Sequence, residues 1–154
     1  MTTTITGATG IDNIQAATGA VLQVVHGTTS TQVDTSSSSY VDTGLTATIT
    51  PSSTSSKILA IYSPSLYHRV DGSTITLQLV RGSTSIAVHG YALYASGALV
   101  ISHVAATHLD SPSTTSATTY KIQMKTGGSN LLSANYDDGS GDTLSTITLM
   151  EIAG

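Results

Sequence analysis

The chain contains no cysteine, no tryptophan and no phenylalanine, and three of its 154 residues are proline. Without cysteine, no disulfide can hold the fold and no thiol chemistry is available. The seven tyrosines are all that the chain offers for a platform that stacks bases or sugars. These absences exclude thiol enzymes and folds stapled by disulfides.

Charged residues are scarce as well, at 9% of the chain, against an average of about 25%. The net charge is −4, so the chain lacks the basic stripe that a nucleic-acid binder needs to neutralise phosphates. No apolar run reaches the roughly 18 residues of a membrane-spanning helix. The first residues lack the basic start and apolar run of a signal peptide. We therefore expect no nucleic-acid partner, no membrane insertion and no secretion address.

Serine and threonine make up about a third of the chain and alternate with aliphatic residues in short segments. Strict alternation at residues 45–50, 74–81 and 118–125 predicts strands with one buried face and one wet face. Residues 57–62 are apolar on both faces and predict a central strand, and residues 20–25 predict a buried one. Further strands are expected at residues 85–89, 98–106, 131–134 and 143–152, with a possible short helical turn at residues 91–95.

About eight to ten short strands separated by Ser, Gly and Asp turns, with no internal repeat, favour an all-β fold. The expected architecture is a jelly-roll-like antiparallel β-sandwich over residues 20–154. Residues 1–19 are small, polar and punctuated by glycine, and they predict an extended N-terminal arm. Its large apolar residues are Ile5, Ile11 and Ile14.

The arm cannot bury enough apolar surface to offset its own ordering entropy. It therefore folds against its own domain or a neighbouring copy, or docks on a different protein in an assembly. In the second case Ile5, Ile11 and Ile14 anchor it to the particle. Gly7 and Gly10 let the backbone lie close to the partner.

The last strand predicts an oligomer. Leu144, Thr146, Thr148, Met150 and Ile152 share one face of it, and Ile147 and Leu149 lie on the other. A strand that is apolar on both sides needs two layers of cover, and a second copy is a ready source of the outer layer. The candidate interface residues are Ile147, Leu149, Met150 and Ile152.

Metal sites are weakly indicated. His103 and His108 lie five residues apart, on opposite faces of a straight strand, and Asp110 follows, whereas zinc needs three or four convergent ligands. Residues 137–142 hold three carboxylates in a Gly-rich turn, but without the spacing and terminal Glu of an EF-hand. Whether this turn binds a cation stays open, and no cofactor is expected.

An enzyme is not expected. No Gly-x-Ser-x-Gly elbow follows a strand, and paired carboxylates for glycoside cleavage would have to be aspartates, because the single glutamate is Glu151. Tyr67, His68 and Arg69 lie in a segment expected to be a solvent-facing loop. They form a candidate contact for a glycan or another subunit.

Four segments carry a resemblance to a protein family: residues 4–19 (TITGATGIDNIQAATG), 45–59 (LTATITPSSTSSKIL), 79–84 (LVRGST) and 145–152 (STITLMEI). The chain resembles virion structural proteins of tailed bacteriophages, many of them marine, which are tail-fibre or other surface components. The resemblance implies a jelly-roll-like trimer displayed on the virion and carries over no functional residues. Fibre proteins usually have a long shaft, so a short capsid-decoration or head-fibre protein fits the length better.

The preferred hypothesis is therefore a non-enzymatic phage virion protein, a homotrimer anchored by its N-terminal arm. Its partners are further copies of itself and other capsid or tail proteins, in a virion assembled in the host cytoplasm. One alternative is a receptor-binding tail-fibre tip that recognises host surface polysaccharide. A further alternative is a free lectin-like binding module.

Overall fold

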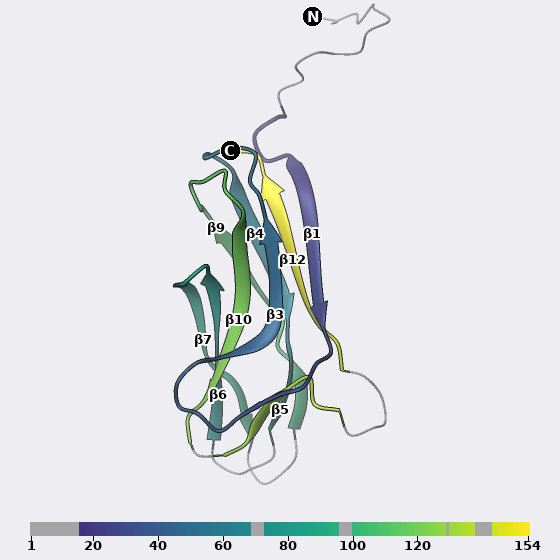
Figure 1. The fold of residues 1–154 in the computed structure, drawn as a ribbon, viewed down its shortest axis with the longest axis vertical. Helices are drawn as coiled ribbons and strands as arrows, with labels where there is room; N and C mark the ends of the chain where they lie inside the picture. The colour runs from purple at the N-terminus through teal and green to yellow at the C-terminus, as the bar shows by residue number, and fades with distance from the viewer. Residues whose placement is uncertain (1–15, 69–72, 96–99, 129, 138–142) are drawn as a thin grey trace, which may run out of the picture.

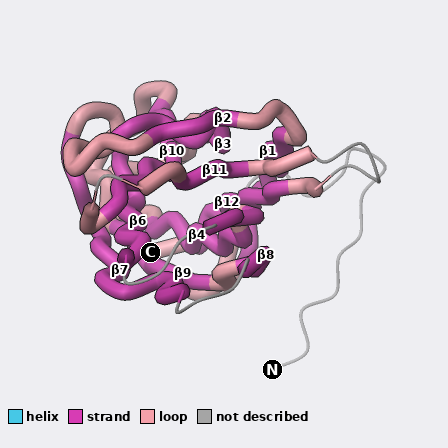
Figure 2. Tube along the Cα trace, turned by 90° about the horizontal axis from the view of Figure 1, so that it is seen from below, coloured by secondary structure: helices cyan, strands magenta, loops and turns pink. Residues whose placement is uncertain are grey.

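The computed structural model describes residues 16–68, 73–95, 100–128, 130–137 and 143–154 (Figure 1). In this part of the chain every regular element is a strand, and no helix segment is present (Figure 2). Accordingly, the described residues contain no helix long and apolar enough to span a membrane. The strands are β1 (Val21–Thr29), β2 (Val33–Thr35), β3 (Val41–Ile49), β4 (Lys57–Ser63), β5 (Ser65–His68), β6 (Ser73–Arg81), β7 (Thr84–Ala95), β8 (Val100–His103), β9 (Ala106–Asp110), β10 (Thr118–Thr126), β11 (Leu132–Ala134) and β12 (Ser145–Ile152).

The strands form three antiparallel sheets of four strands each. Sheet A has the order β1-β12-β4-β9, sheet B the order β2-β11-β5-β8, and sheet C the order β3-β10-β6-β7. Sheet B continues sheet A, because β1 leads into β2, β4 into β5, β8 into β9 and β11 into β12 at matching positions. Sheets A and B thus form one layer of the sandwich and sheet C forms the other.

Counting each continued pair once reduces the twelve strands by four to eight strand positions. In chain order, the first, eighth, third and sixth positions lie side by side in one layer, and the second, seventh, fourth and fifth in the other. This order is that of an eight-stranded jelly roll. The predicted all-β, jelly-roll-like antiparallel sandwich is confirmed.

The core lies between the two layers. It is formed by every second residue of the strands, the residues whose side chains point inward. Tyr120, Ile122 and Met124 of β10 are fully buried, as the alternation predicts. The inward side chains of β3 and β6 meet those of β4 and β12 in the same cluster: Leu45, Ala47, Ile49, Ile75, Leu77, Leu79, Ile58, Ala60, Tyr62, Ile147 and Leu149. Truncating one such Leu or Ile to Ala typically costs about 2–5 kcal/mol.

The two layers lie close together where β1 crosses β3. A Cβ atom added to Gly27 would lie 2.3 Å from the carbonyl oxygen of Thr46 and 3.2 Å from Ile147. Opposite this point, the pairing of β10 with β3 shifts register between Lys121 and Gln123. The Thr46 hydroxyl donates to the Tyr120 carbonyl oxygen at 3.0 Å, so a side chain supplies a hydrogen bond beside the irregularity.

At one end of β9 a polar cluster joins the layers. The Asp110 carboxylate accepts two hydrogen bonds from Arg81 of β6, at 2.9 and 2.8 Å, and one from the Tyr120 hydroxyl at 2.6 Å. Asp110 and Tyr120 are both buried. Burial and the neighbouring Asp110 carboxylate raise the pKa of Tyr120. The hydroxyl therefore stays protonated and keeps donating to Asp110.

Sheets A and B join at Pro64, which has no N–H to donate to the ladder. Beside it, the Ser145 hydroxyl accepts from the Ser65 N–H at 2.8 Å and pairs with the Asn135 side chain. Asn135 has a φ of 53° and donates through Nδ2 to the Thr31 carbonyl oxygen at 3.0 Å. Side chains thus supply hydrogen bonds at the end of β11 and the start of β12, where the regular ladder stops.

Several local predictions were wrong. Residues 21–25 form part of an edge strand rather than a buried one, and Val21 and Val24 are more than half exposed. Residues 91–95 belong to β7 and are not a helical turn. Residues 98–106 do not form one strand, since β8 ends at His103 and β9 begins at Ala106.

Candidate interaction surfaces

The outer face of sheet A carries an apolar row that crosses all four strands. Val24 of β1 pairs with Met150 of β12, Met150 pairs with Leu59 of β4, and Leu59 pairs with Leu109 of β9. Direct cross-strand partners lie about 4.5–5.5 Å apart, so these four side chains form a continuous band. Val24 is 56% exposed and Leu109 is 52% exposed.

A second row flanks this band. His26, Thr148, Ile61 and Thr107 are cross-strand partners in that order. The ring of His26 hydrogen-bonds the Thr148 hydroxyl through Nδ1 at 2.9 Å. We call the outward surface formed by both rows and Ile152 the apolar face; its apolar members are Val24, Leu59, Ile61, Leu109, Met150 and Ile152.

The outer face of sheet C has the opposite character. Asp42 of β3 forms an ion pair with Lys121 of β10 at 2.9 Å and accepts a hydrogen bond from Gln123 at 2.6 Å. Burial raises the pKa of Asp42, but the hydrogen bonds from Lys121 and Gln123 outweigh this and lower the pKa. Lys125 lies over the Tyr40 ring, 4.7 Å from its centroid.

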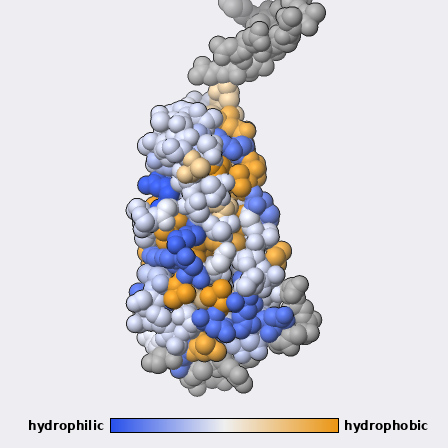
Figure 3. Space-filling view, viewed as in Figure 1, coloured by the Kyte–Doolittle hydropathy of each residue, from blue (hydrophilic) through white to orange (hydrophobic). Residues whose placement is uncertain are grey.

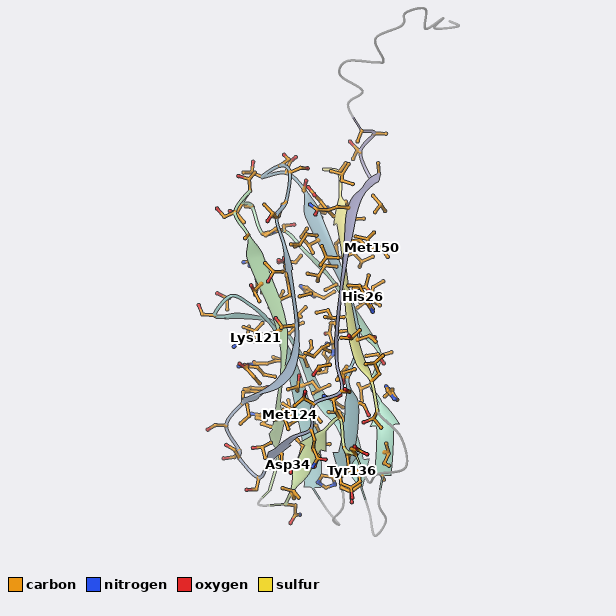
Figure 4. All side chains as sticks on the ribbon, turned by 45° about the vertical axis from the view of Figure 1, so that its right-hand side comes forward. His26, Asp34, Lys121, Met124, Tyr136 and Met150 are labelled. Atoms are coloured by element: carbon orange, nitrogen blue, oxygen red, sulfur yellow. The ribbon has the colours of Figure 1, made fainter. Side chains whose placement is uncertain are left out.

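The figures show this contrast. His26 and Met150 lie on one side of the sandwich and Lys121 on the other (Figure 4). Hydrophobic residues gather along the β1 edge in Figure 3, whereas a group of hydrophilic residues lies over β10. The two broad faces of the molecule are therefore chemically distinct.

The four predicted interface residues divide between the two faces of β12. Ile147 and Leu149 are fully buried in the protomer's own core, where they pack beneath sheet C. Met150 and Ile152 are half-buried and lie on the outer side. The inner layer of cover is thus supplied by the chain itself, and the prediction of an intermolecular contact now concerns Met150 and Ile152.

The predicted glycan-contact residues are not in a solvent-facing loop. Tyr67 and His68 lie in β5 and are buried, and Arg69 lies outside the described residues. The Tyr67 ring stacks on Tyr136 with centroids 3.8 Å apart. His68 faces the core beside Leu132; neither ring nitrogen has a hydrogen-bond partner within the described structure, and burial lowers its pKa. The sequence pattern missed β5 because residues 65–68 lack alternation.

The predicted metal candidates do not converge. His103 is exposed and His108 half-buried on the opposite side of their layer, and Asp110 is bound to Arg81 and Tyr120. The described residues contain no group of three potential metal ligands. In the 137–142 turn, Asp137 is exposed and its N–H donates to the Gln32 side chain at 3.1 Å; the rest lies outside the described residues.

The predicted arm anchors Ile5, Gly7, Gly10, Ile11 and Ile14 also lie outside the described residues. The described part begins with exposed residues 16–19, beside the C-terminus (Figure 1). Gly19 donates to the Ala153 carbonyl oxygen at 2.8 Å, and Ala153 donates to that of Ala20 at 2.8 Å. The chain therefore enters the sandwich as a continuation of the β1–β12 ladder.

The sequence analysis did not predict that Glu151 would be a buried charge. Glu151 is fully buried at the inner side of β12 and accepts hydrogen bonds from Gln23 and from the N–H and hydroxyl of Ser52. Burial raises its pKa, but these hydrogen bonds outweigh the burial and lower the pKa from 4.5 to about 2. The available signal was a lone Glu in an apolar strand and a Ser-rich turn after Pro51.

Two open hollows lie on the described surface, with volumes of about 170 Å³ beside Gly44 and Lys121 and about 270 Å³ beside Ser52 and Gly154. Both are smaller than the roughly 300–1,000 Å³ of typical small-molecule sites. They do not favour a substrate pocket. The broad faces of the sandwich are the stronger candidates for function.

No protein-family model matches the chain, and no curated protein matches its sequence. The chain is similar to one in the structure of the infectious bursal disease virus Gt strain, with 14% identity and a TM-score of 0.45, over 97% of this chain and 43% of that one. The VP2 subviral particle of the same virus gives 14% identity and a TM-score of 0.45, over 96% of this chain and 42% of that one. The Gx strain gives 13% identity and a TM-score of 0.45, over 96% of this chain and 47% of that one. This chain spans less than half the length of those viral chains.

Proposed function

We propose that this protein is a non-enzymatic structural protein of a tailed-phage virion, a capsid-decoration or head-fibre protein that assembles as a homotrimer. The observation that carries the proposal is the apolar face, whose two rows contain no Asp, Glu, Lys or Arg, on a sandwich whose other broad face is polar and hydrogen-bonded. A surface of this kind is suited to packing against other subunits rather than to chemistry. The resemblance of four sequence segments to phage virion proteins supports the same role.

Several ionisable groups of the kind that an enzyme would need hold the fold together instead. Asp110 joins the two layers through Arg81 and Tyr120, and Glu151 fastens β12 to the turn at Ser52. The Tyr62 hydroxyl pairs with His89 across the sandwich, and burial raises the pKa of Tyr62 to about 12. Each group has a structural partner, and this supports a mechanical role.

A decoration or head-fibre role is preferred to a receptor-binding tip for a specific reason. Tyr67 and His68, the residues on which glycan contact was based, are buried in β5. Recognition of polysaccharide would need exposed aromatic and polar groups, and these two do not supply them. The hypothesis of a free lectin-like module is weakened for the same reason, because it also requires exposed residues that contact a glycan.

In this proposal the arm of residues 1–19 anchors the trimer to the particle. The described chain enters the sandwich at one end, next to the C-terminus, so the point at which the arm joins the sandwich lies at an end rather than on a broad face (Figure 1). Ile5, Ile11 and Ile14 supply its apolar contacts, and Gly7 and Gly10 allow a close backbone approach.

The test is co-sedimentation with particles that lack this protein. We expect a chain without residues 1–14 to remain folded and oligomeric but to lose incorporation into particles. The triple variant Ile5→Ser, Ile11→Ser and Ile14→Ser should lose incorporation in the same way. The matched control, Thr3→Ser, Thr6→Ser and Thr9→Ser, should bind like the wild type. Unchanged occupancy of the truncated chain would place the attachment surface on the sandwich itself.

A further inference from the structure

The apolar face has the composition of a docking surface. Its central row, Val24, Met150, Leu59 and Leu109, runs without interruption from the β1 edge of sheet A to the β9 edge. With neighbouring strands about 4.8 Å apart, the row is about 15 Å long. Exposed apolar residues are ordinary when they are scattered, but a contiguous band across a whole sheet is a recognised mark of an interface.

The distribution of charged side chains on the outer side of sheet A indicates which partner the apolar face binds. Within the described part of sheet A, Lys57, at the end of β4, is the charged side chain on the outer side, since Glu151 and Asp110 are buried and bonded inside. The flanking row consists of Thr148, Thr107 and His26 around Ile61. Hydroxyl groups both donate and accept hydrogen bonds, so they can pair with copies of themselves.

We infer that the apolar face packs against a second copy of this chain, an inference that rests on the oligomer in the proposed function. Near the rotation axis of a cyclic oligomer, side chains face copies of themselves, and like charges there would repel. The two rows of the face combine aliphatic and hydroxyl groups and contain no Asp, Glu, Lys or Arg, so they meet this requirement. Lys57 lies at the edge of the face, as the cross-strand partner of Ile152. A charged protein partner or an anionic membrane would instead call for several complementary charges within the rows.

The first test introduces a charge at either end of the row. Val24→Lys and Leu109→Lys change exposed side chains, and Val88→Lys is the matched control, because Val88 is 58% exposed on the polar outer side of sheet C. We expect both face variants to raise the dissociation constant of the full-length oligomer at least about 100-fold, because an unpaired ammonium group would be buried. The control should leave it unchanged. Sedimentation velocity across the micromolar range measures this, and circular dichroism verifies that each variant keeps its strands.

The second test uses the absence of cysteine from the chain. Val24→Cys and Thr148→Cys place single thiols on the apolar face, and Val88→Cys places one on the opposite face. Under mild oxidation, we expect one or both face variants to give covalent dimers several times faster than the control. These small substitutions preserve the uncharged surface, so they test the inference even if a lysine variant fails to fold.

Three results would overturn the inference. The first is a wild-type chain that stays monomeric throughout the micromolar range. The second is an oligomer that Val24→Lys and Leu109→Lys weaken no more than the control does. The third is a monomer whose face variants lose incorporation into particles, which would assign the face to a different virion protein. Arm variants that still incorporate would contradict the proposed function but leave the apolar face unaffected, so the two failures are distinguishable.

Discussion

At the scale of single residues, a buried charge fastens the last strand to a neighbouring turn. Glu151 lies on the inner side of β12, and its carboxylate accepts from the Ser52 N–H at 2.7 Å and from the Ser52 hydroxyl at 2.6 Å. Hydrogen bonds to the ionised form favour that form, which is why the pKa falls despite burial. The negative charge is therefore part of the folded structure at neutral pH.

This has a consequence for acid stability. The folded pKa of Glu151 is about 2, below the ordinary value of 4.5, so its contribution is fully present above pH 4.5 and is lost as the pH falls towards 2. We expect Glu151→Gln to lower the free energy of unfolding at pH 6 and to flatten its dependence on pH between 4.5 and 2. Chemical denaturation at a series of pH values measures both effects.

The control is Asp42→Asn, which removes a carboxylate on the exposed outer side of sheet C. Its effect should be smaller, because exposed ion pairs contribute about 0–1 kcal/mol. An acid transition identical in wild-type and Glu151→Gln proteins would contradict a stabilising role for the carboxylate.

Gly27 is required at the crossing of β1 and β3 because of space rather than backbone conformation. The carbonyl oxygen of Thr46 would lie 2.3 Å from an added Cβ, and backbone cannot move aside as a flexible side chain can. We expect Gly27→Ala to lower the free energy of unfolding by about 1–3 kcal/mol. Gly90→Ala is the control, since no atom lies within 4 Å of the added Cβ there. Equal thermal stability of the two variants would contradict the close approach of the layers.

At the scale of elements, the junction of sheets A and B depends on side chains. Pro64 separates β4 from β5, and its carbonyl oxygen accepts from the Val104 N–H at 3.2 Å, opposite the break between β8 and β9. The Ser145 hydroxyl supplies the acceptor that the Ser65 N–H needs. Ser145 of β12 therefore connects to β5 and to Asn135, the residue that follows β11, where the regular ladder stops.

We expect Ser145→Ala to lower the free energy of unfolding by about 1–3 kcal/mol, because it leaves the buried Ser65 N–H without its acceptor. The matched control is Thr48→Ala, whose hydroxyl pairs with Thr119 at 2.8 Å on the exposed surface. That change should cost less than about 0.5 kcal/mol. Urea denaturation of both variants measures the difference, and a loss no larger than that of the control would show that the junction is held by packing alone.

At the scale of the whole molecule, the two broad faces of the sandwich differ in polarity. Sheet C presents an outer side on which Asp42, Lys121 and Gln123 bond to one another, so its polar groups are already paired. Sheet A presents the apolar face, which gains from burial at about 25 cal/mol per Å² of apolar surface. In the proposed function the arm binds the particle and the apolar face binds a second copy, so we expect the arm deletion and the lysine variants to have separate effects.

Much of the fold followed from local patterns. The alternation at residues 118–125 placed Tyr120, Ile122 and Met124 inward, and the two-sided apolar character of residues 57–62 placed β4 centrally; the structure confirms both. The candidate interface was less predictable. Of the four residues proposed for an interface, Ile147 and Leu149 serve the protomer's own core.

The sequence predicted the strands better than the surface because the two depend on interactions of different range along the chain. Alternation of side chains is a property of each strand by itself, so the sequence determined the all-β class, the faces of the regular strands and the scarcity of charge. Which strand lies at an edge depends on pairing between distant segments, such as Val24 with Met150. Only the tertiary structure could therefore decide that β1 is an exposed edge, that Tyr67 and His68 are covered, and that Leu59, Leu109, Val24 and Met150 meet in one row.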